Sequence, residues 1–237
     1  MRYRAIIFDL DGTLRISQPR FMDALLACAH DMGIPVETEP WRQAERWIHR
    51  YWARSPELVG DLDIYDRDTV WVRFLWRLLH QAGYPAGEEE AQALADAFAG
   101  SYRPDSVLMP GAQEVLEDLA SSDVTLGVLS NREQPFDDEL EALNIGHHFN
   151  FTLAAGEVGI WKPQPEVFYA ALERAGHVSP QHAIYIGDNY YADIVGARAA
   201  GLDALLVDSR AVFADVDCPV VHHLSDILTY VRNSSDG

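Results

Sequence analysis

The chain has 237 residues, of which 48% are hydrophobic and 11% aromatic, so it can bury the core of one large domain or of a domain with an insertion. Its formal net charge of −19 repels phosphate backbones and anionic membrane surfaces, so we expect neither nucleic acid nor membrane as a partner. The two cysteines, Cys28 and Cys218, lack the spacing of a metal site or a disulfide framework. No apolar run is long enough for a signal peptide or a membrane span. Together these two observations predict a cytoplasmic protein.

The first predicted element is an apolar run at residues 4–9, which is typical of a strand buried on both faces. From about residue 17 to residue 101 helical patterns replace strand patterns, and this stretch holds most of the tryptophans. We therefore predict an all-helical cap inserted after the first strand. Residues 60–68 are interpreted as a loop that ends at a helix-capping residue, Asp68. The predicted cap helices cover residues 20–32, 41–53, 68–82 and 88–99.

Beyond the cap, short apolar runs alternate with helical patterns. Pro104 and the turn at residues 109–111 mark the return from the cap. Alternation of this kind implies right-handed crossovers between parallel strands, with helices on both faces of the sheet. The predicted strands of this part are residues 124–130, 151–155, 182–187 and 204–207, and the predicted helices are residues 112–120, 134–143, 165–175 and 190–200.

These elements predict an α/β fold with two domains. Residues 1–16 and 102–237 are expected to form a three-layer, Rossmann-like core around a parallel sheet, and residues 17–101 the helical cap. The sequence leaves the oligomeric state open between a monomer and a homodimer.

Polar side chains follow the ends of the predicted strands, where ligands bind in sheets of this kind. Closely packed carboxylates repel one another and raise one another's pKa values, and a divalent cation relieves that repulsion. Oxygen ligands without histidine or cysteine favour Mg²⁺. The residues concerned are Asp9, Asp11, Ser130, Asn131, Lys162, Asp188 and Asp193.

Four segments in order, FDLDGTL, LSN, KPQPEVF and GDNYYAD, resemble the motif set of the haloacid dehalogenase-like (HAD) hydrolase superfamily. A helical insertion after the first motif is also similar to members of that superfamily. The segment MPGAQEVLEDL resembles the cap-return segment of its phosphoglycolate phosphatase-like members. The resemblance implies a Mg²⁺-dependent phosphatase that acts on a small phosphorylated metabolite through an aspartyl-phosphate intermediate.

The resemblance also implies roles for individual residues. Asp9 is expected to attack phosphorus, and Asp11 to protonate the leaving group and then to deprotonate the attacking water. Thr13 is expected to orient Asp11 and the turn. Ser130 and the backbone N–H groups of Leu10 and Asn131 are expected to bind the phosphate. Asp9, Asp188 and the backbone carbonyl of Asp11 are expected to bind Mg²⁺. Asp193 is expected to support that metal site, either around the metal or through Lys162.

Lys162 is the only lysine among the 18 lysine and arginine residues. A compact ammonium can touch both the nucleophile and the transferred phosphoryl group, whereas the planar fork of arginine needs more space. We therefore predict that Lys162 keeps Asp9 ionised. Arg15 lies close enough in sequence to the first motif to reach the substrate.

Other reactions are known on similar scaffolds. Dehalogenation is disfavoured because halide is a leaving group that needs neither an acid such as Asp11 nor a metal. A Schiff-base reaction on a cap lysine is excluded because the cap holds no lysine. A sugar phosphomutase of the β-phosphoglucomutase type stays open, because it uses the same core residues. A phospho-accepting or binding module without turnover is the alternative from another class, and repeated turnover of a phosphate ester separates it from an enzyme.

Overall fold

The computed structural model of the protein describes residues 2–36 and 38–233. The chain forms two compact units, residues 1–16 with 106–237 and residues 17–105, which are described one at a time. None of the helices in the described ranges combines the length and the apolar character that a membrane span needs.

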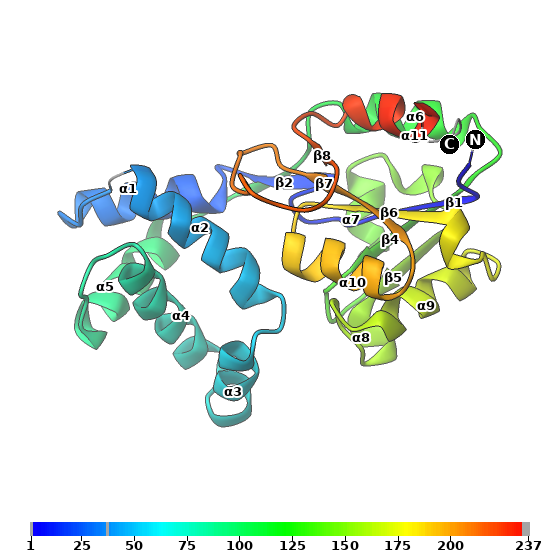
Figure 1. The fold of residues 1–237 in the computed structure, drawn as a ribbon. Helices are drawn as coiled ribbons and strands as arrows, with labels where there is room; N and C mark the ends of the chain where they lie inside the picture. Colours follow the sequence, from blue (N-terminus) through cyan, green and yellow to red (C-terminus); the bar gives the residue numbers. More distant parts are fainter. Residues whose placement is uncertain (1, 37, 234–237) are drawn as a thin grey trace. The chain divides into compact units, whose positions relative to one another are not determined.

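The first unit is built on a parallel sheet of six strands in the order β5-β4-β1-β6-β7-β8 (Figure 1). The central strand β1 (Ala5–Phe8) pairs with β4 (Thr125–Ser130) on one side and with β6 (Ala183–Gly187) on the other. The other strands are β5 (Phe151–Ala154), β7 (Asp203–Val207) and β8 (Val220–Val221). The predicted parallel α/β sheet is therefore confirmed, and the short strand β8 was missed by the sequence analysis.

Both faces of this sheet are covered, because successive side chains along a strand point to opposite faces. In β1, Ile6 and Phe8 belong to one hydrophobic core, and Ala5 and Ile7 belong to the other. One core includes side chains of α6 (Ala112–Ala120), α7 (Asp137–Ala142) and α11 (Asp226–Asn233). The other includes side chains of α9 (Pro165–Arg174) and α10 (Val195–Ala199), so that the unit has three layers (Figure 1). This arrangement explains why the central strands read as continuous apolar runs.

The helices of the first unit connect these strands. The segment predicted as one helix at residues 190–200 begins with a π-helical turn, Tyr190–Ile194, before it continues as α10. The α-helices are α6 (Ala112–Ala120), α7 (Asp137–Ala142), α8 (Ala155–Val158), α9 (Pro165–Arg174), α10 (Val195–Ala199) and α11 (Asp226–Asn233), and the 3₁₀ segments are Gly146–His148 and Pro180–His182.

The second unit is helical and has its own hydrophobic core. Aromatic rings fill much of it: Phe74 lies in contact with Trp47, Trp71 and Tyr51, at ring-centroid distances of 5.8, 5.3 and 5.2 Å. Its helices are α1 (Phe21–Asp31), α2 (Thr38–Trp52), α3 (Pro56–Ile64), α4 (Arg67–Gln81) and α5 (Glu88–Ser101).

The interpretation of residues 60–68 as a loop is wrong, because α3 extends over the first half of this stretch. Ser55 caps α3 by accepting a hydrogen bond from the backbone of Leu58, and Pro56 occupies the first helical turn. The cap of α4 is Asp66, two residues before the predicted Asp68. The acidic residues of this stretch are typical of an exposed loop, so the sequence did not indicate the helix. Asp61 is in fact buried, and two arginines of α4 pair with its carboxylate.

Two short strands lie where the chain passes between the units. β2 (Arg15–Gln18) and β3 (Asp105–Leu108) form a two-stranded sheet that the sequence analysis did not predict. Both are four residues long and partly exposed, so neither carries the apolar run that identifies a buried strand.

Candidate active site

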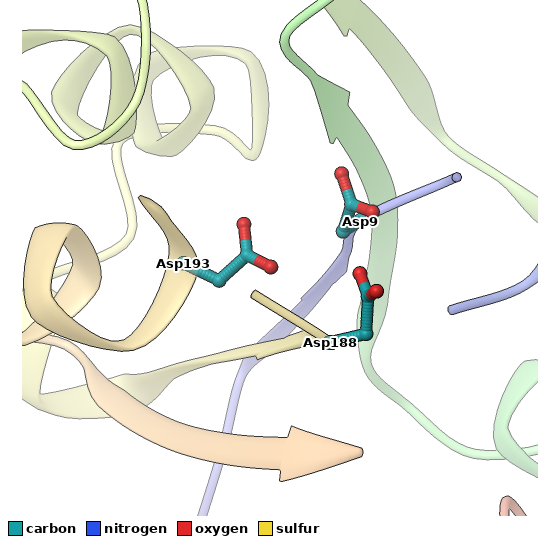
Figure 2. Close-up of side chains that lie close together, drawn as sticks. All are labelled: Asp9, Asp188 and Asp193. Carbon is teal, nitrogen blue, oxygen red and sulfur yellow. The ribbon is translucent and has the colours of Figure 1, made fainter. Parts of the chain in front are cut away.

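Three aspartates meet at the carboxyl ends of the central strands (Figure 2). Asp9 follows β1, Asp188 follows β6, and Asp193 lies in the π-helical turn after β6. Oxygen atoms of the three carboxylates lie within 4.8 Å of one another. Parallel strands place their carboxyl ends at the same edge of the sheet, which explains how residues so distant in sequence converge.

Two glycines allow the backbone to approach these carboxylates. Gly12 has a φ of +91°, and a Cβ at that position would lie 2.2 Å from Oδ2 of Asp188. A Cβ on Gly187 would lie 2.2 Å from Oδ2 of Asp193. Any larger residue at either position would push a carboxylate out of the group.

Lys162 is buried behind the carboxylates, with an exposed fraction of 2%. Its ammonium donates hydrogen bonds to Oδ1 of Asp9 at 2.6 Å, to Oδ1 of Asp193 at 2.7 Å and to the hydroxyl of Tyr185 at 2.9 Å. A longer contact of 3.5 Å to the Leu129 carbonyl completes the set of acceptors around the ammonium. Lys162 therefore joins the predicted nucleophile to Asp193.

The loop that carries Lys162 is held by Asn131, directly after β4. Oδ1 of Asn131 accepts a hydrogen bond of 2.7 Å from the backbone N–H of Lys162, and its Nδ2 donates one of 3.0 Å to the Lys162 carbonyl. The Asn131 side chain thus positions the lysine. Its backbone N–H stays a predicted phosphate donor.

Other predicted residues lie around the same strand ends. Ser130 is the last residue of β4 and is 2% exposed, and Leu10 follows Asp9 and is fully buried. The hydroxyl of Thr13 donates to Oδ1 of Asp188 at 3.4 Å. The sequence analysis had expected Thr13 to orient Asp11, whereas this contact directs its hydroxyl to the carboxylate group.

Asp11 lies outside the group of three carboxylates. Nε and Nη2 of Arg132 donate to its two oxygens, each at 2.8 Å. Nη1 of Arg15 lies 3.1 Å from Oδ1 of Asp11. The predicted acid and base is therefore held by two guanidinium groups, a contact that the sequence analysis did not foresee.

The carboxylates carry raised pKa values. Burial raises the pKa of Asp9 to about 7, against the opposing effect of Lys162, and the charges of Asp193 and Asp11 add to the rise. Loss of solvent and the charges of Asp9 and Asp193 raise the pKa of Asp188 well above its usual value. Burial alone would lower the pKa of Lys162, but the charges of Asp193 and Asp9 raise it well above its usual value, so that the ammonium stays protonated.

A set of three carboxylates with one ammonium has an excess of negative charge. The donors are all oxygen atoms and are closely grouped, which is what a hard divalent cation requires. Both oxygens of Asp193 already accept hydrogen bonds, from Lys162 and from the backbone of Asn189. Asp9 and Asp188 are thus the better placed of the three to hold a cation.

The sequence analysis missed three residues of this region. Tyr185 donates to the Leu129 carbonyl at 2.7 Å and contacts Lys162, and its only signal was a polar atom within a buried strand. Arg132 directly follows the LSN motif, a position that could have suggested a role in the site. Glu139 pairs with both Arg132 and Arg15, and nothing in the sequence marks it among the other acidic residues of α7.

Comparison with known proteins identifies the family of this chain. Residues 3–201 match the family model of the haloacid dehalogenase-like hydrolases. The chain belongs to this family. The predicted membership and the prediction of a hydrolase are therefore confirmed.

Several relatives of this hydrolase are named as phosphatases, among them the following two. The chain is 38% identical to a phosphoserine phosphatase of Thermus thermophilus, over 86% of this chain and 88% of the relative. It is 29% identical to a phosphoglycolate phosphatase of Salmonella typhimurium, over 84% of this chain and 78% of the relative. The predicted similarity to phosphoglycolate phosphatases is confirmed.

The fold also matches solved structures of the family. The hydrolase aligns with a 2-haloacid dehalogenase of Pseudomonas syringae at a TM-score of 0.57 and 29% identity, covering 98% of this chain and all 100% of that one. This family thus includes proteins named for different reactions, and the choice among reactions depends on the residues of the site.

Proposed function

We propose that the hydrolase is a Mg²⁺-dependent phosphatase that acts on small phosphorylated metabolites through an aspartyl-phosphate intermediate. The observation that carries the proposal is the group formed by Asp9, Asp188 and Asp193 with Lys162 at the strand ends. A nucleophilic carboxylate beside a buried ammonium suits attack on phosphorus, where negative charge must be offset at close range.

In the first step, an oxygen of Asp9 attacks phosphorus as the bond to the ester oxygen breaks. Asp11 gives its proton to the departing alkoxide, so that the substrate leaves as an alcohol. Ser130 and the backbone N–H groups of Leu10 and Asn131 hold the phosphoryl oxygens. Lys162 contacts Asp9 at 2.6 Å and reduces the repulsion between this carboxylate and the incoming phosphate.

In the second step, water attacks the phosphorus of the acyl phosphate. Asp11, now ionised, takes a proton from this water, the bond between phosphorus and the Asp9 oxygen breaks, and inorganic phosphate leaves. Asp9 is then free of phosphate, and Asp11 carries the proton taken from water, which it can give to the next leaving group.

The residues that would hold Mg²⁺ are Asp9, Asp188 and the backbone carbonyl of Asp11. When bound, the ion supplies positive charge that offsets the carboxylates and the phosphate. Thr13 and Gly12 fix Asp188 from one side, through a 3.4 Å hydrogen bond and through the absence of a side chain. Asp193 holds Lys162 in place at 2.7 Å.

The names of two relatives support a substrate class for this proposal. Phosphoserine and phosphoglycolate each combine a phosphate monoester with a carboxylate, and they are the substrates after which two relatives are named. We infer that the hydrolase acts on a small phosphate ester of the same kind.

Dehalogenation is less well supported, although one similar structure is named for that reaction. Halide leaves without a proton, so that reaction gives no role to an acid at Asp11 or to the carboxylates that surround Asp9. Asp188 and Asp193 have a role in phosphoryl transfer, where a cation must be held.

The proposal is tested by a screen of phosphorylated metabolites with Mg²⁺, in which release of free phosphate is measured. Asp9→Asn is expected to lose turnover by about a thousandfold or more, because an amide does not form the acyl phosphate. Asp123→Asn, an exposed acid of the same unit, is the matched control and is expected to keep wild-type rates.

Wild-type turnover by the Asp9→Asn variant would refute the nucleophile assignment. Transfer of the phosphoryl group between sugar positions without phosphate release would identify a mutase. Labelling of the protein once, without further turnover, would identify a phospho-accepting module.

A further inference from the structure

The carboxylate of Asp11 is bound in a geometry that a carboxylate of a ligand could share. Nε and Nη2 of Arg132 donate to the two oxygens of Asp11 in parallel, each at 2.8 Å. This bidentate arrangement is the one in which a guanidinium recognises a carboxylate with the greatest geometric specificity. The Asp11 carboxylate thus shows what kind of anion fits the site on Arg132.

The Arg132 guanidinium is both held and accessible. Its third nitrogen, Nη1, donates to Oε2 of Glu139, and its centre lies 5.7 Å from the centroid of the Phe136 ring. The Arg132 side chain is nevertheless 27% exposed, so it reaches solvent beside Asp11. Glu139 and Phe136 would keep the guanidinium in place when another anion replaces Asp11.

Glu139 is itself held by Arg15 and Ser106 as well as by Arg132, although Arg15 also contacts Asp11. Nε of Arg15 donates to Oε1 of Glu139 at 2.9 Å and to the hydroxyl of Ser106 at 2.8 Å, and Ser106 donates to the same Glu139 oxygen at 2.6 Å. Burial alone would raise the pKa of Glu139, but hydrogen bonds from Arg132 and Ser106 lower it to about 2, so that it stays ionised. The support of Arg132 is therefore a fixed ionic network.

In the proposed reaction Asp11 must turn to the leaving-group oxygen, and it then gives up at least part of its contact with Arg132. That movement would leave the Arg132 guanidinium with an unfilled carboxylate site on the leaving-group side of the phosphate. A partly buried guanidinium that loses one of its two carboxylate partners and keeps only Glu139 costs free energy, and an anion on the substrate removes that cost.

We propose that Arg132 is a specificity-determining residue that binds a carboxylate on the leaving group of the substrate, in exchange for the carboxylate of Asp11. This proposal rests on the proposed phosphatase function and deepens it. Substrates with the carboxylate both bind Arg132 and release Asp11 toward the leaving-group oxygen, whereas substrates without it must break the Asp11 contact unaided.

The test compares substrate pairs in which one member lacks only the carboxylate. O-phosphoserine is paired with phosphoethanolamine, and phosphoglycolate with methyl phosphate. The quantity measured is the ratio of kcat/KM within each pair, for the wild type and for Arg132→Gln and Arg132→Lys. Arg198→Gln, which removes another arginine paired with an aspartate on the surface of the same unit, is the control.

The wild type is expected to prefer the carboxylate-bearing member of at least one pair. Arg132→Gln is expected to reduce that preference by about 10- to 100-fold, because a charge-assisted bidentate contact is lost. The loss should fall mainly on KM of the carboxylate-bearing substrate, and Arg132→Lys should restore part of it. Arg198→Gln should leave the ratio unchanged.

Two outcomes would overturn the proposal. The first is a wild type without preference for the carboxylate in either pair. The second is an unchanged ratio in Arg132→Gln, and if kcat/KM then falls equally for both members of a pair, the role of Arg132 is purely structural. The first measurement needs no variant and therefore stands even if Arg132→Gln does not fold. Absence of turnover with every phosphate ester would instead refute the proposed function.

Discussion

The two units of the hydrolase each bury charged side chains, but they balance the charges differently. In the helical unit, Asp61 is 4% exposed and pairs with Arg73 at 2.9 Å and Arg77 at 3.2 Å. In the sheet unit, three carboxylates share the one ammonium of Lys162. The anion of the first cluster has two cationic partners within the protein, whereas the second cluster has more anions than cations.

This difference separates a structural cluster from a functional one. A buried acid with two cationic partners holds α3 against α4 and needs nothing from outside. Carboxylates whose pKa values are raised by burial and by one another are held in an unfavourable state. Such a state is expected at a functional site, where binding of a cation offsets the unfavourable free energy of the grouped carboxylates.

After loss of the nucleophile itself, the largest effect is expected in the sheet unit from Lys162→Arg. The substitution keeps the charge, but the wider guanidinium does not fit a position with contacts of 2.6, 2.7 and 2.9 Å to Asp9, Asp193 and Tyr185. Turnover is expected to fall by about a thousandfold, since preorganised charge stabilisation is lost at the reacting atoms. The measurement is kcat with the best substrate of the screen.

Arg198→Lys serves as the matched exchange on the surface of the same unit, and it should leave kcat unchanged. Near-normal turnover of Lys162→Arg would show that the ammonium has no special role.

In the helical unit, Asp61→Ala is expected to lower the free energy of unfolding by about 3 kcal/mol, because two partly buried arginines lose their shared partner. Denaturant unfolding measures this change. Asp63→Ala, an exposed acid of the same helix, should change the free energy by less than about 0.5 kcal/mol. Equal effects of the two substitutions would contradict the structural role of Asp61.

Substitution of one glycine in each unit distinguishes the effect of backbone strain from the effect of displacing a carboxylate of the active site. Gly12 has a φ of +91° and no room for a Cβ beside Asp188, whereas Gly83 has a φ of +79° and nothing within 4 Å. Gly83→Ala should therefore cost only about 1 kcal/mol of stability and leave turnover intact. Gly12→Ala should cost about 2 kcal/mol and also lower turnover, because the added methyl group displaces the Asp188 carboxylate.

Purified variants assayed by thermal unfolding and by kcat would report both quantities. If Gly12→Ala behaved like Gly83→Ala, the close packing of Gly12 on Asp188 would have no functional role.

The smallest effect is a dependence of Mg²⁺ stabilisation on pH. Asp9 has a pKa of about 7 in the folded protein and 3.8 as a free side chain, so that between these values the folded state holds a proton which the unfolded chain has released. The stability of the metal-free protein therefore falls as pH rises through this window. Mg²⁺ must displace the remaining protons, and it should raise Tm by a few degrees more at about pH 8 than at about pH 6. Equal Tm increments at both values would argue against a cation on Asp9.

Much of the fold and of the candidate site could be predicted from the sequence, for a physical reason. Strands buried on both faces give continuous apolar runs, and the residues that follow them must meet at one edge of a parallel sheet. The positions of Asp9 and Asp188 directly after β1 and β6, and of Ser130 as the last residue of β4, follow from that rule.

What the sequence could not provide depends on partners that are distant along the chain. The sequence around Asp61 is typical of an acidic loop, so α3 was not predicted. The arginine partners that allow Asp61 to be buried in a helix lie on α4. The bidentate contact of Arg132 with Asp11 joins residues 121 positions apart, and no local pattern marks it. β2 and β3 are too short and too exposed to give a periodic signal.

The central claim is that the three carboxylates of the sheet unit outnumber the single ammonium of Lys162 because the site binds a divalent cation that offsets their remaining charge. Calorimetric titration of Mg²⁺ into the metal-free wild type and into Asp188→Asn at about pH 8 tests it most directly. The account predicts stoichiometric binding to the wild type and a loss of affinity by at least about tenfold in the variant, with unchanged binding to Asp63→Asn. Equal affinity of Mg²⁺ for the wild type and for Asp188→Asn would contradict the account.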